Sequence, residues 1–212
     1  MLSRREFVGA VGAIAVSAAG APAAPDRRPK WRVLDLGHDC LLHESLAGFC
    51  LAGVSECRPP RDTQESASYI VPAAAGLSAK LMTHLSRNVQ AGGRLIFESA
   101  AAFGGFEAQR RQLARYFGLT IEPPFNLWTG DASPPYVDYH WPIRVKVRDF
   151  SHAVPVVAKK ADVIGAIGKI PIAAHAGRFV FLGSPIGPSL LAGDREAHLW
   201  FNALLQQPDF PL

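Results

Sequence analysis

One stretch of about thirty residues restricts the fold of this chain more than any other, because its pattern is that of a strand, a helix and a second strand. Residues 67–71 form a short run with high β-propensity that stops at Pro72. Ser78 is a typical N-cap for the helix that follows, and Gly92-Gly93 is a typical helix end. Apolar residues recur at helical spacing between them, at Leu81, Met82, Leu85 and Val89. Residues 94–98 (RLIFE) indicate a buried strand, so the spacing predicts a right-handed βαβ unit with parallel strands.

The flanking segments continue this alternation of strands and helices. Strands are expected at residues 31–36 and 54–57, with a helix at 39–52 between them. A further helix is expected at 105–117, and another strand begins at 119–121. Apolar strands that alternate with helices are typical of an α/β protein whose sheet is mostly parallel and covered on both faces.

The end of the chain has a different pattern. Residues 143–147 alternate strictly between apolar and basic, which indicates a half-exposed strand. Residues 171–175 and 178–183 flank a short hairpin-like connection. We therefore expect an antiparallel addition at one edge of the sheet. Asp194 is placed to cap a last helix that buries Leu199, Trp200, Ala203 and Leu204.

The first residues predict where the protein works. Arg4 and Arg5 precede a mildly apolar stretch, residues 7–20, as in a twin-arginine export leader. Ala21-Pro22-Ala23 is a small-x-small cleavage pattern, so we expect a signal peptide over 1–23 and a single domain over 24–212. Such a chain is exported already folded by the twin-arginine machinery and is periplasmic or secreted. The alternative is a buried N-terminal helix that happens to begin with two arginines.

Charge and composition exclude several classes of partner. The full chain has 22 Lys and Arg against 18 Asp and Glu, and the expected mature chain has 20 against 17. This balance is too weak to indicate nucleic acid or an anionic membrane surface. After the leader, no segment approaches the roughly 20 apolar residues of a membrane span. Without a glycine-rich phosphate loop or a Cys-x-x-Cys-His motif, we expect no cofactor.

Three cysteines, Cys40, Cys50 and Cys57, leave two alternatives open. In an oxidising compartment Cys50 and Cys57 could form one bridge and leave a free thiol. A chain that folds before export could equally keep three buried, reduced thiols.

Two passages carry a resemblance to a known family. Residues 69–103, with their strand, proline, helix, Gly-Gly and strand, resemble the class I glutamine-amidotransferase-like superfamily. The passage is most like the trehalose-utilisation-type members and the trimerisation domains of some β-galactosidases. Residues 177–184 (GRFVFLGS) are similar to the closing strand of the family. Together they cover roughly a third of the mature chain, and the resemblance implies a flavodoxin-like three-layer sandwich.

The chain departs from the catalytic members of that family. Catalytic amidotransferases carry a nucleophilic cysteine in a Gly-x-Cys-x-Gly turn after a strand. Here the corresponding strand ends Phe97-Glu98-Ser99-Ala100-Ala101, and no late His-x-Glu pair follows. We therefore interpret the chain as catalytically degenerate, without glutaminase activity.

Candidate site residues lie where the expected parallel strands end, because ligands bind at that edge of such sheets. The loops after Leu36, after Val71, at Glu98-Ser99 and at Ser184 should converge there. Glu98 could act as a general base or bind a sugar hydroxyl, and Ser99 could be a nucleophile with a positioned base. The alternative is that Glu98 caps the next helix or pairs with an arginine.

The first of these loops, residues 37–44, is the densest group of reactive side chains. His38, Asp39 and His43 could ligate a divalent metal ion, although their spacing matches no strong metal signature. The alternative is that Asp39 caps a helix and His43 lies at its solvent-exposed edge.

The segment 123–142 is rich in aromatic residues and prolines and holds most of the candidate ligand-binding residues. Aromatic faces beside carboxylates suit sugar rings, and the same side chains suit a protein interface. The alternative is that the rings complete the core. The residues concerned are Phe125, Asn126, Trp128, Asp131, Tyr136, Asp138, Tyr139 and Trp141, with Ser184 added from the edge of the sheet.

Two functional hypotheses follow from the sequence. The first is an exported, non-catalytic binding or assembly domain that recognises a carbohydrate-like ligand or a partner protein. The second is a periplasmic hydrolase that acts on a sugar or an amide and uses Glu98 with His38 or Asp39. The first is favoured because no complete catalytic set is visible.

Overall fold

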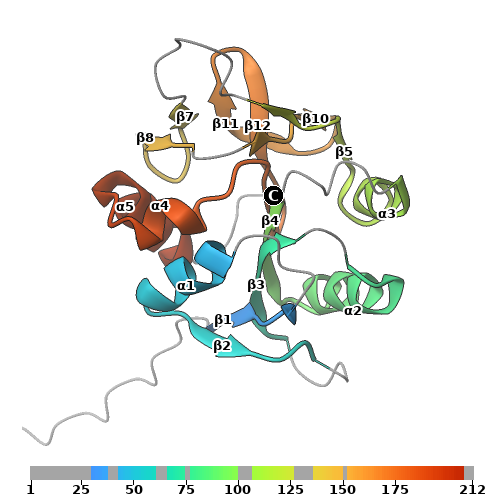
Figure 1. Cartoon of the computed structure of the whole chain (residues 1–212). Coiled ribbons are helices and arrows are strands. Elements are labelled where there is room, and N and C mark those ends of the chain that lie inside the picture. The colour runs from blue at the N-terminus through green and yellow to red at the C-terminus, as the bar shows by residue number, and fades with distance from the viewer. Residues whose placement is uncertain are drawn as a thin grey trace, which may run out of the picture.

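The structure is a computed structural model that describes residues 30–37, 43–60, 66–74, 77–99, 107–126, 136–149 and 152–207. Its main element is a nine-stranded sheet with the strand order β2-β1-β3-β4-β13-β12-β11-β7-β8 (Figure 1). Five neighbouring strands are parallel and form what we call the parallel half. These are β2 (Ser55–Cys57), β1 (Trp31–Leu34), β3 (Ser68–Ala74), β4 (Arg94–Ser99) and β13 (Phe179–Leu182).

The remaining four strands run antiparallel to their neighbours and form what we call the antiparallel extension. They are β12 (Ile170–Ala176), β11 (Asp162–Ile167), β7 (Tyr136–Tyr139) and β8 (Val145–Arg148). Two short antiparallel pairs lie outside this sheet: β5 (Leu119–Ile121) with β10 (Val156–Ala158), and β6 (Phe125–Asn126) with β9 (His152–Ala153).

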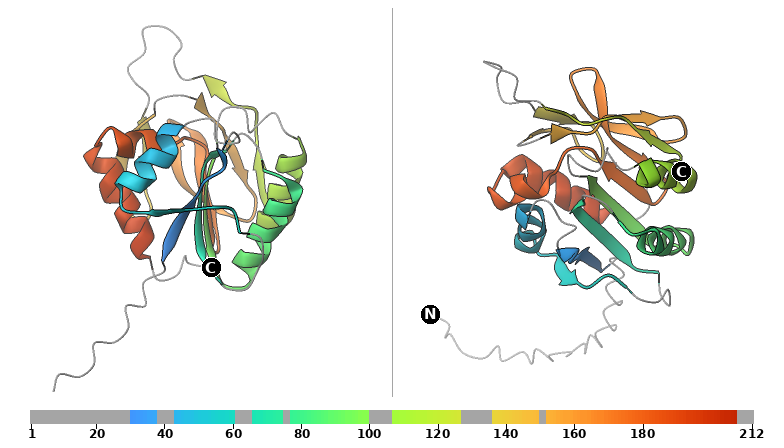
Figure 2. Two further views of the ribbon diagram at one scale, coloured as in Figure 1. Left: turned by 60° about the horizontal axis from the view of Figure 1, so that its bottom comes forward. Right: turned by 45° about the vertical axis from the view of Figure 1, so that its right-hand side comes forward.

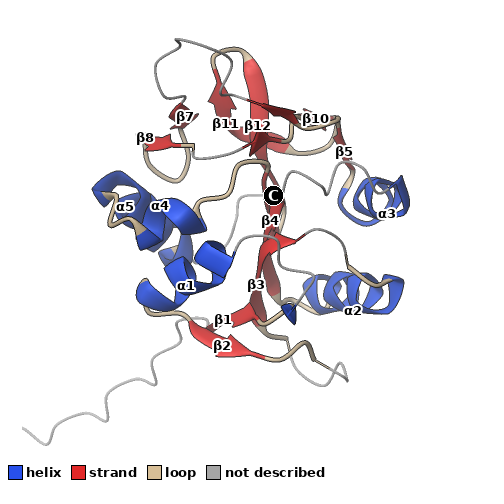
Figure 3. Ribbon diagram, viewed as in Figure 1, coloured by secondary structure: helices blue, strands red, loops and turns tan. Residues whose placement is uncertain are grey.

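Helices cover the sheet on both sides, which gives the three layers of the expected α/β architecture (Figures 2 and 3). On one side lie α1 (His43–Leu51), α4 (Gly187–Leu191) and α5 (Arg195–Gln206). On the other lie α2 (Ala79–Gln90) and α3 (Glu107–Phe117). Each side has its own apolar core: Phe49 and Trp200 belong to the first, and Met82 and Phe117 to the second.

The predicted βαβ unit is confirmed. Strands β3 and β4 are parallel neighbours joined through α2, and the Ser78 hydroxyl accepts a hydrogen bond from the Leu81 N–H at 3.2 Å. Gly92, which follows the helix, has a φ of +98°, a conformation that favours glycine. The predicted end of the first strand at Pro72 is wrong, because β3 continues to Ala74. The register shifts between Val71 and Ala74, so Pro72 lies at an irregularity where no ladder N–H is needed.

The antiparallel extension is larger than the edge addition that the sequence predicted. The hairpin of β12 and β13 and the half-exposed strand β8 are confirmed, with ends that differ by a few residues. Strand β7 lies inside the proline-rich segment 123–142, where no strand was predicted. Its four residues alternate between exposed and buried. The predicted strand at 119–121 forms, but it pairs with β10 outside the main sheet.

The last helix begins as expected, because the Asp194 carboxylate accepts hydrogen bonds from the N–H groups of Glu196 and Ala197. The expected burial of Leu199 is wrong, since this side chain is 49% exposed. The buried face of α5 has the spacing i, i+3, i+4 and i+7, and consists of Ala197, Trp200, Phe201 and Leu204. Leu199 falls outside this stripe, whereas Phe201, which was not among the residues expected to be buried, belongs to it.

Cys50 and Cys57 are both free thiols, so the bridge between them is not formed, and Cys40 lies outside the described residues. Cys50 is exposed and Cys57 is half-buried, and burial is the main cause that raises the pKa of each thiol. Among the helices that the structure describes, none is both long and apolar enough to cross a membrane. The predicted leader, residues 1–23, lies outside the described residues.

Candidate functional site

The carboxyl ends of three parallel strands, β3, β4 and β13, lie near one buried carboxylate, that of Glu98. Glu98 is completely buried near the end of β4. One of its oxygens accepts a hydrogen bond from the Ala73 N–H, and the other accepts one from the Gly187 N–H, both at 2.8 Å. The side chain therefore ties the end of β3 to the start of α4.

Local geometry at both donors fits this arrangement. Ala73 has a φ of +25°, which is rare for a residue with a side chain and marks a position that its surroundings hold in place. At the other donor, α1 and α4 approach so closely that a Cβ on Gly187 would lie 2.4 Å from the Ser45 Cα. A Cβ on Gly48 would lie 1.9 Å from the Gly187 carbonyl oxygen. Small residues thus let α1 close over the edge of the sheet above Glu98.

Burial raises the pKa of the Glu98 carboxyl above its ordinary value. The Gly187 N–H, the Ser45 hydroxyl and the Ala73 N–H favour the ionised form and oppose part of this shift. The Ser45 hydroxyl acts here through proximity, because it makes no hydrogen bond of ordinary geometry with any described residue.

The two serines predicted at this edge are buried and bonded. The Ser99 hydroxyl donates to the Leu182 carbonyl at 3.1 Å, which joins β4 to β13. The Ser184 hydroxyl donates to the Asp149 carboxylate at 2.7 Å. Asp149 is itself fully buried, and sequence reasoning missed it. The one feature of the sequence that could have pointed to Asp149 is its position directly after the half-exposed strand β8.

Three of the four loops that should converge do so through these contacts, since Glu98 contacts the loop after Val71 and the loop after Ser184. The fourth loop contains His38 and Asp39, which lie outside the described residues, while His43 is exposed at the start of α1. No group of three or more His, Cys, Asp or Glu side chains suited to a metal ion occurs within the described ranges.

The aromatic residues of the segment 123–142 separate into two kinds. Tyr136 is 49% exposed, whereas Tyr139 is buried with its ring centroid 4.1 Å from that of Trp200. Trp141 is half-buried: its carbonyl accepts the Trp200 indole N–H at 2.8 Å, and its ring lies 4.9 Å from that of His175. Burial, with the charges of Asp149 and Glu98, raises the pKa of Tyr139. Tyr139 thus belongs to the core and Tyr136 to the surface.

Phe125 is half-buried and packs against the same core as Trp141. Trp128 and Asp131, the other predicted ligand-binding residues of this segment, lie outside the described residues.

An open pocket of about 230 Å³ is lined by Asp138, Tyr139, His140 and Arg144, all of which follow Tyr136 in the chain. The alternation of β7 places Asp138 on the same exposed face as Tyr136. The His140 Nε2 lies 2.8 Å from the Val163 carbonyl, which fixes the ring. The pocket is smaller than the usual drug-sized site.

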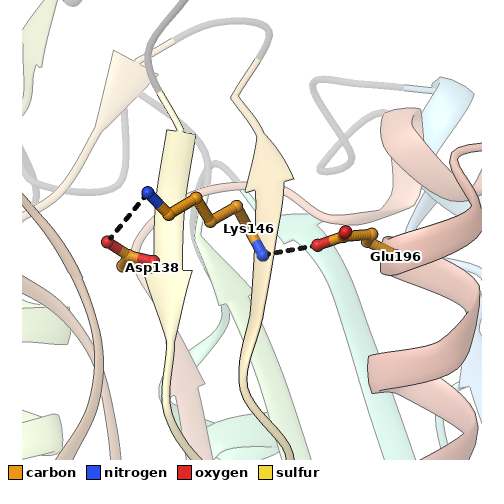
Figure 4. A network of polar contacts seen from close by, with 3 residues as sticks. All are labelled: Asp138, Lys146 and Glu196. Carbon is orange, nitrogen blue, oxygen red and sulfur yellow. Dashed lines mark hydrogen bonds and ion pairs between the residues drawn. The ribbon is translucent and has the colours of Figure 1, made fainter.

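Lys146 connects this pocket to α5 (Figure 4). Its Nζ lies 3.8 Å from the Asp138 carboxylate, and its backbone N–H donates to the Glu196 carboxylate at 2.7 Å. The surface defined by Tyr136, Asp138, His140 and Arg144, which we call the β7 surface, therefore offers a ring face, hydrogen-bond donors and an acceptor.

The comparisons with known proteins identify similar folds but no protein family. No protein-family model and no curated protein matches the sequence. Among solved structures, the exo-beta-1,4-mannosidase Op5Man5 from Opitutaceae bacterium strain TAV5 has a TM-score of 0.59 at 15% identity, over 85% of this chain and 37% of that chain. A beta-galactosidase from the psychrophilic Marinomonas ef1 has a TM-score of 0.57 at 17% identity, over 84% of this chain and 29% of that chain.

A ThuA-like protein from Bacteroides uniformis ATCC 8492 is matched over nearly its whole length. Its TM-score is 0.58 at 12% identity, over 90% of this chain and 97% of that chain. At these identities the likeness shows the fold alone, and this fold is consistent with the superfamily that the sequence resembles. The chain spans less than two fifths of the length of the mannosidase and the galactosidase.

Proposed function

We propose that this protein is an exported, non-catalytic binding domain that recognises a carbohydrate-like ligand through the β7 surface. The observation that carries the proposal is the contrast in accessibility between two sets of side chains. Tyr136 is about half exposed on the same face of β7 as Asp138, which lines an open pocket together with Tyr139, His140 and Arg144. Glu98 and Ser99, which a reaction at the edge of the parallel strands would need, are fully buried and hydrogen-bonded.

The chemistry of the β7 surface suits a sugar. The exposed Tyr136 ring can stack against the C–H face of a pyranose, while the carboxylate of Asp138 and the guanidinium of Arg144 bond its hydroxyls. Two of the similar solved structures are a mannosidase and a beta-galactosidase, which supports a sugar-related role for this fold. The alternative hydrolase would need Glu98 to reach a substrate, but Glu98 is fully buried and both of its carboxylate oxygens accept hydrogen bonds from backbone N–H groups.

A binding experiment tests this proposal. Isothermal titration with a panel of neutral and acidic monosaccharides should identify a ligand, and Tyr136→Ala should weaken its binding about tenfold, as the loss of an aromatic anchor does. Tyr136→Phe should retain the affinity, because it keeps the ring. Arg144→Ala should also weaken binding, whereas Arg111→Ala on α3, where the arginine is 74% exposed, should not. The proposal fails if no sugar binds, or if Tyr136→Ala binds as well as the parent.

A partner protein could use the same exposed side chains, and this is the second form that the binding role could take. Ile143, 38% exposed, lies next to Arg144 and extends the β7 surface with apolar area. Binding of a protein that Tyr136→Ala abolishes, in the absence of any sugar binding, would favour this form over the first.

Export is the second part of the proposal, and it rests on the arginine pair Arg4-Arg5 in front of the apolar stretch 7–20. Replacing both by lysine should retain the protein in the cytoplasm. The matched control is the second arginine pair, Arg27-Arg28, which lies after the expected cleavage site. Its replacement by two lysines should leave export unchanged, and equal loss of export in both variants would contradict a twin-arginine leader.

A further inference from the structure

Within the described residues, the two outer strands of the nine-stranded sheet are protected to different degrees. At β8, the backbone N–H of Lys146 donates to the Glu196 carboxylate at 2.7 Å, and the Arg148 carbonyl accepts the Ser189 hydroxyl at 2.9 Å. Helices α4 and α5 thus cover the main-chain groups of this edge. At the opposite end, no described strand lies beyond β2 (Figure 1). An uncovered edge strand is a template for pairing with another strand.

The direction of the main-chain groups along β2 follows from one hydrogen bond. The Asp35 N–H donates to the Cys57 carbonyl at 2.8 Å, so the main-chain groups of Cys57 point toward β1. Because these groups alternate along a strand, those of Glu56 point away from the sheet. Arg58 directly follows the last residue of β2, and a continued alternation would direct its main-chain groups away from the sheet as well. Pro59 and Pro60 follow and limit the length of the edge.

Side chains at this edge are exposed and of opposite charge. Glu56 and Arg58 are both exposed, and their spacing of two residues places them on the same face. Cys57 packs against the core on the side of α2, so Glu56 and Arg58 lie on the side of α1. At the end of α1, Leu51 is 62% exposed, the highest value among the exposed large apolar residues of the described chain.

We propose that the β2 edge pairs with the β2 edge of a second copy of this chain, antiparallel and with the two-fold axis at Cys57. Glu56 of each copy then lies opposite Arg58 of the other, and the outward main-chain groups of these residues can form four hydrogen bonds. Centring the pair on residue 56 or on residue 58 would instead place two glutamates or two arginines opposite each other. The charges therefore select the register, and the two sheets become continuous across the dimer.

The proposed interface is small, because β2 has only three residues, so we expect a weak, reversible dimer. It does not depend on the proposed function, because β2 and the β7 surface belong to opposite ends of the sheet. Loss of sugar binding and loss of dimerisation are therefore distinguishable results.

Disulfide trapping tests the register. In the proposed dimer the two Cys57 residues form a non-hydrogen-bonded pair with Cα atoms about 4.5 Å apart, within the range that a disulfide spans. A variant with Cys40 and Cys50 replaced by serine should form a covalent dimer on mild oxidation with copper phenanthroline. The matched control adds Cys57→Ser and Ser55→Cys, which moves the thiol two residues along the same face. The two thiols of the control lie about 13 Å apart along the strands and should not cross-link.

Charge reversal tests the interface without thiol chemistry. Glu56→Arg and Arg58→Glu should each weaken self-association about tenfold in sedimentation velocity, because each replaces two attractive pairs by two repulsive ones. An equimolar mixture of these two variants should restore the dimer, since every arginine then meets a glutamate of the other variant. The proposal is overturned if the Cys57 variant remains monomeric, if the Ser55→Cys control cross-links as readily, or if the mixture associates no better than its components.

Discussion

Glu98 and Asp138, one carboxylate from each half of the sheet, have opposite surroundings. In the parallel half, Glu98 is completely buried and its two oxygens bind the main chain of β3 and α4. In the antiparallel extension, Asp138 is 65% exposed and lines an open pocket. The comparison teaches that the end of the parallel strands, where ligands bind in many such folds, serves here to hold elements together. The surface that is free to bind lies in the extension.

Burial patterns explain this division. Strands β4 and β13 are buried at every position, as expected for strands covered by helices on both faces. Strand β7 alternates between exposed and buried residues, because α5 covers only one of its faces. Polar side chains on the uncovered face of β7 are therefore available to a ligand, whereas polar side chains on β4 must find partners inside the protein.

The largest effect should come from removing the buried carboxylate. Glu98→Ala leaves the Ala73 and Gly187 N–H groups buried without an acceptor, and we expect it to lower the free energy of unfolding by about 3–5 kcal/mol. Urea denaturation at neutral pH measures this loss. Asp138→Ala is the matched control in the extension, and it should change stability by less than about 0.5 kcal/mol. Equal losses would contradict the division between the two halves.

A smaller loss is expected where the extension packs on its helix. A Cβ on Gly165 would lie 2.7 Å from Cδ1 of Tyr139, and that ring cannot move away because Trp200 lies behind it. Gly165→Ala should therefore cost about 1–3 kcal/mol. In a Tyr139→Leu background the same change should cost much less, because the ring is gone. A double-mutant cycle by urea denaturation checks the coupling, and additive losses would show that Tyr139 is not the obstacle.

Much of the fold could be predicted because the signals are local. Ser78, Gly92 and the apolar spacing between them mark α2, and Asp194 marks the start of α5. Strand β7 could not be predicted, since Tyr136–Tyr139 is four residues long and its pairing with β11 and β8 is set by distant parts of the chain. The continuation of β3 past Pro72 depends likewise on a register shift that tertiary contacts create.

The site was harder to predict than the fold. Sequence reasoning placed Glu98, Ser99 and Ser184 at one edge, where they do lie, and it offered a structural role for Glu98 as the alternative, but it did not predict that all three are buried and bonded. Burial of Glu98 depends on Gly48 and Gly187, which let two helices far apart in sequence meet above it. Among the aromatic residues, composition could not distinguish the exposed Tyr136 from the buried Tyr139, because the distinction follows from the alternation of β7.

The pH dependence of stability should have opposite signs in the two halves. Burial raises the pKa of Glu98, so the folded protein binds this proton more tightly than the unfolded chain, and stability rises as pH falls toward the ordinary value of 4.5. Burial lowers the pKa of His175, partly offset by Asp162, so stability falls as pH drops below the ordinary value of 6.5. Each group can contribute a slope of at most about 1.4 kcal/mol per pH unit.

Two variants separate these slopes. Relative to Glu98→Gln, the parent protein should gain stability on acidification, and relative to His175→Gln it should lose stability. Urea denaturation between pH 4.5 and pH 8 measures both differences. The same sign for both variants would show that burial does not govern the two groups as described.

The smallest effects should separate the two contacts of Lys146 in Figure 4. Its backbone hydrogen bond to Glu196 protects the β8 edge, and Glu196→Ala should cost about 0.5–1.5 kcal/mol at any salt concentration. The pair of its Nζ with Asp138 is exposed on both sides, so Asp138→Asn should cost less than about 0.5 kcal/mol, and 1 M salt should abolish that difference. Urea denaturation at low and high salt distinguishes the two. A salt-independent cost for Asp138→Asn would mean that this carboxylate, like Glu98, is held by the fold and is not free to bind a ligand.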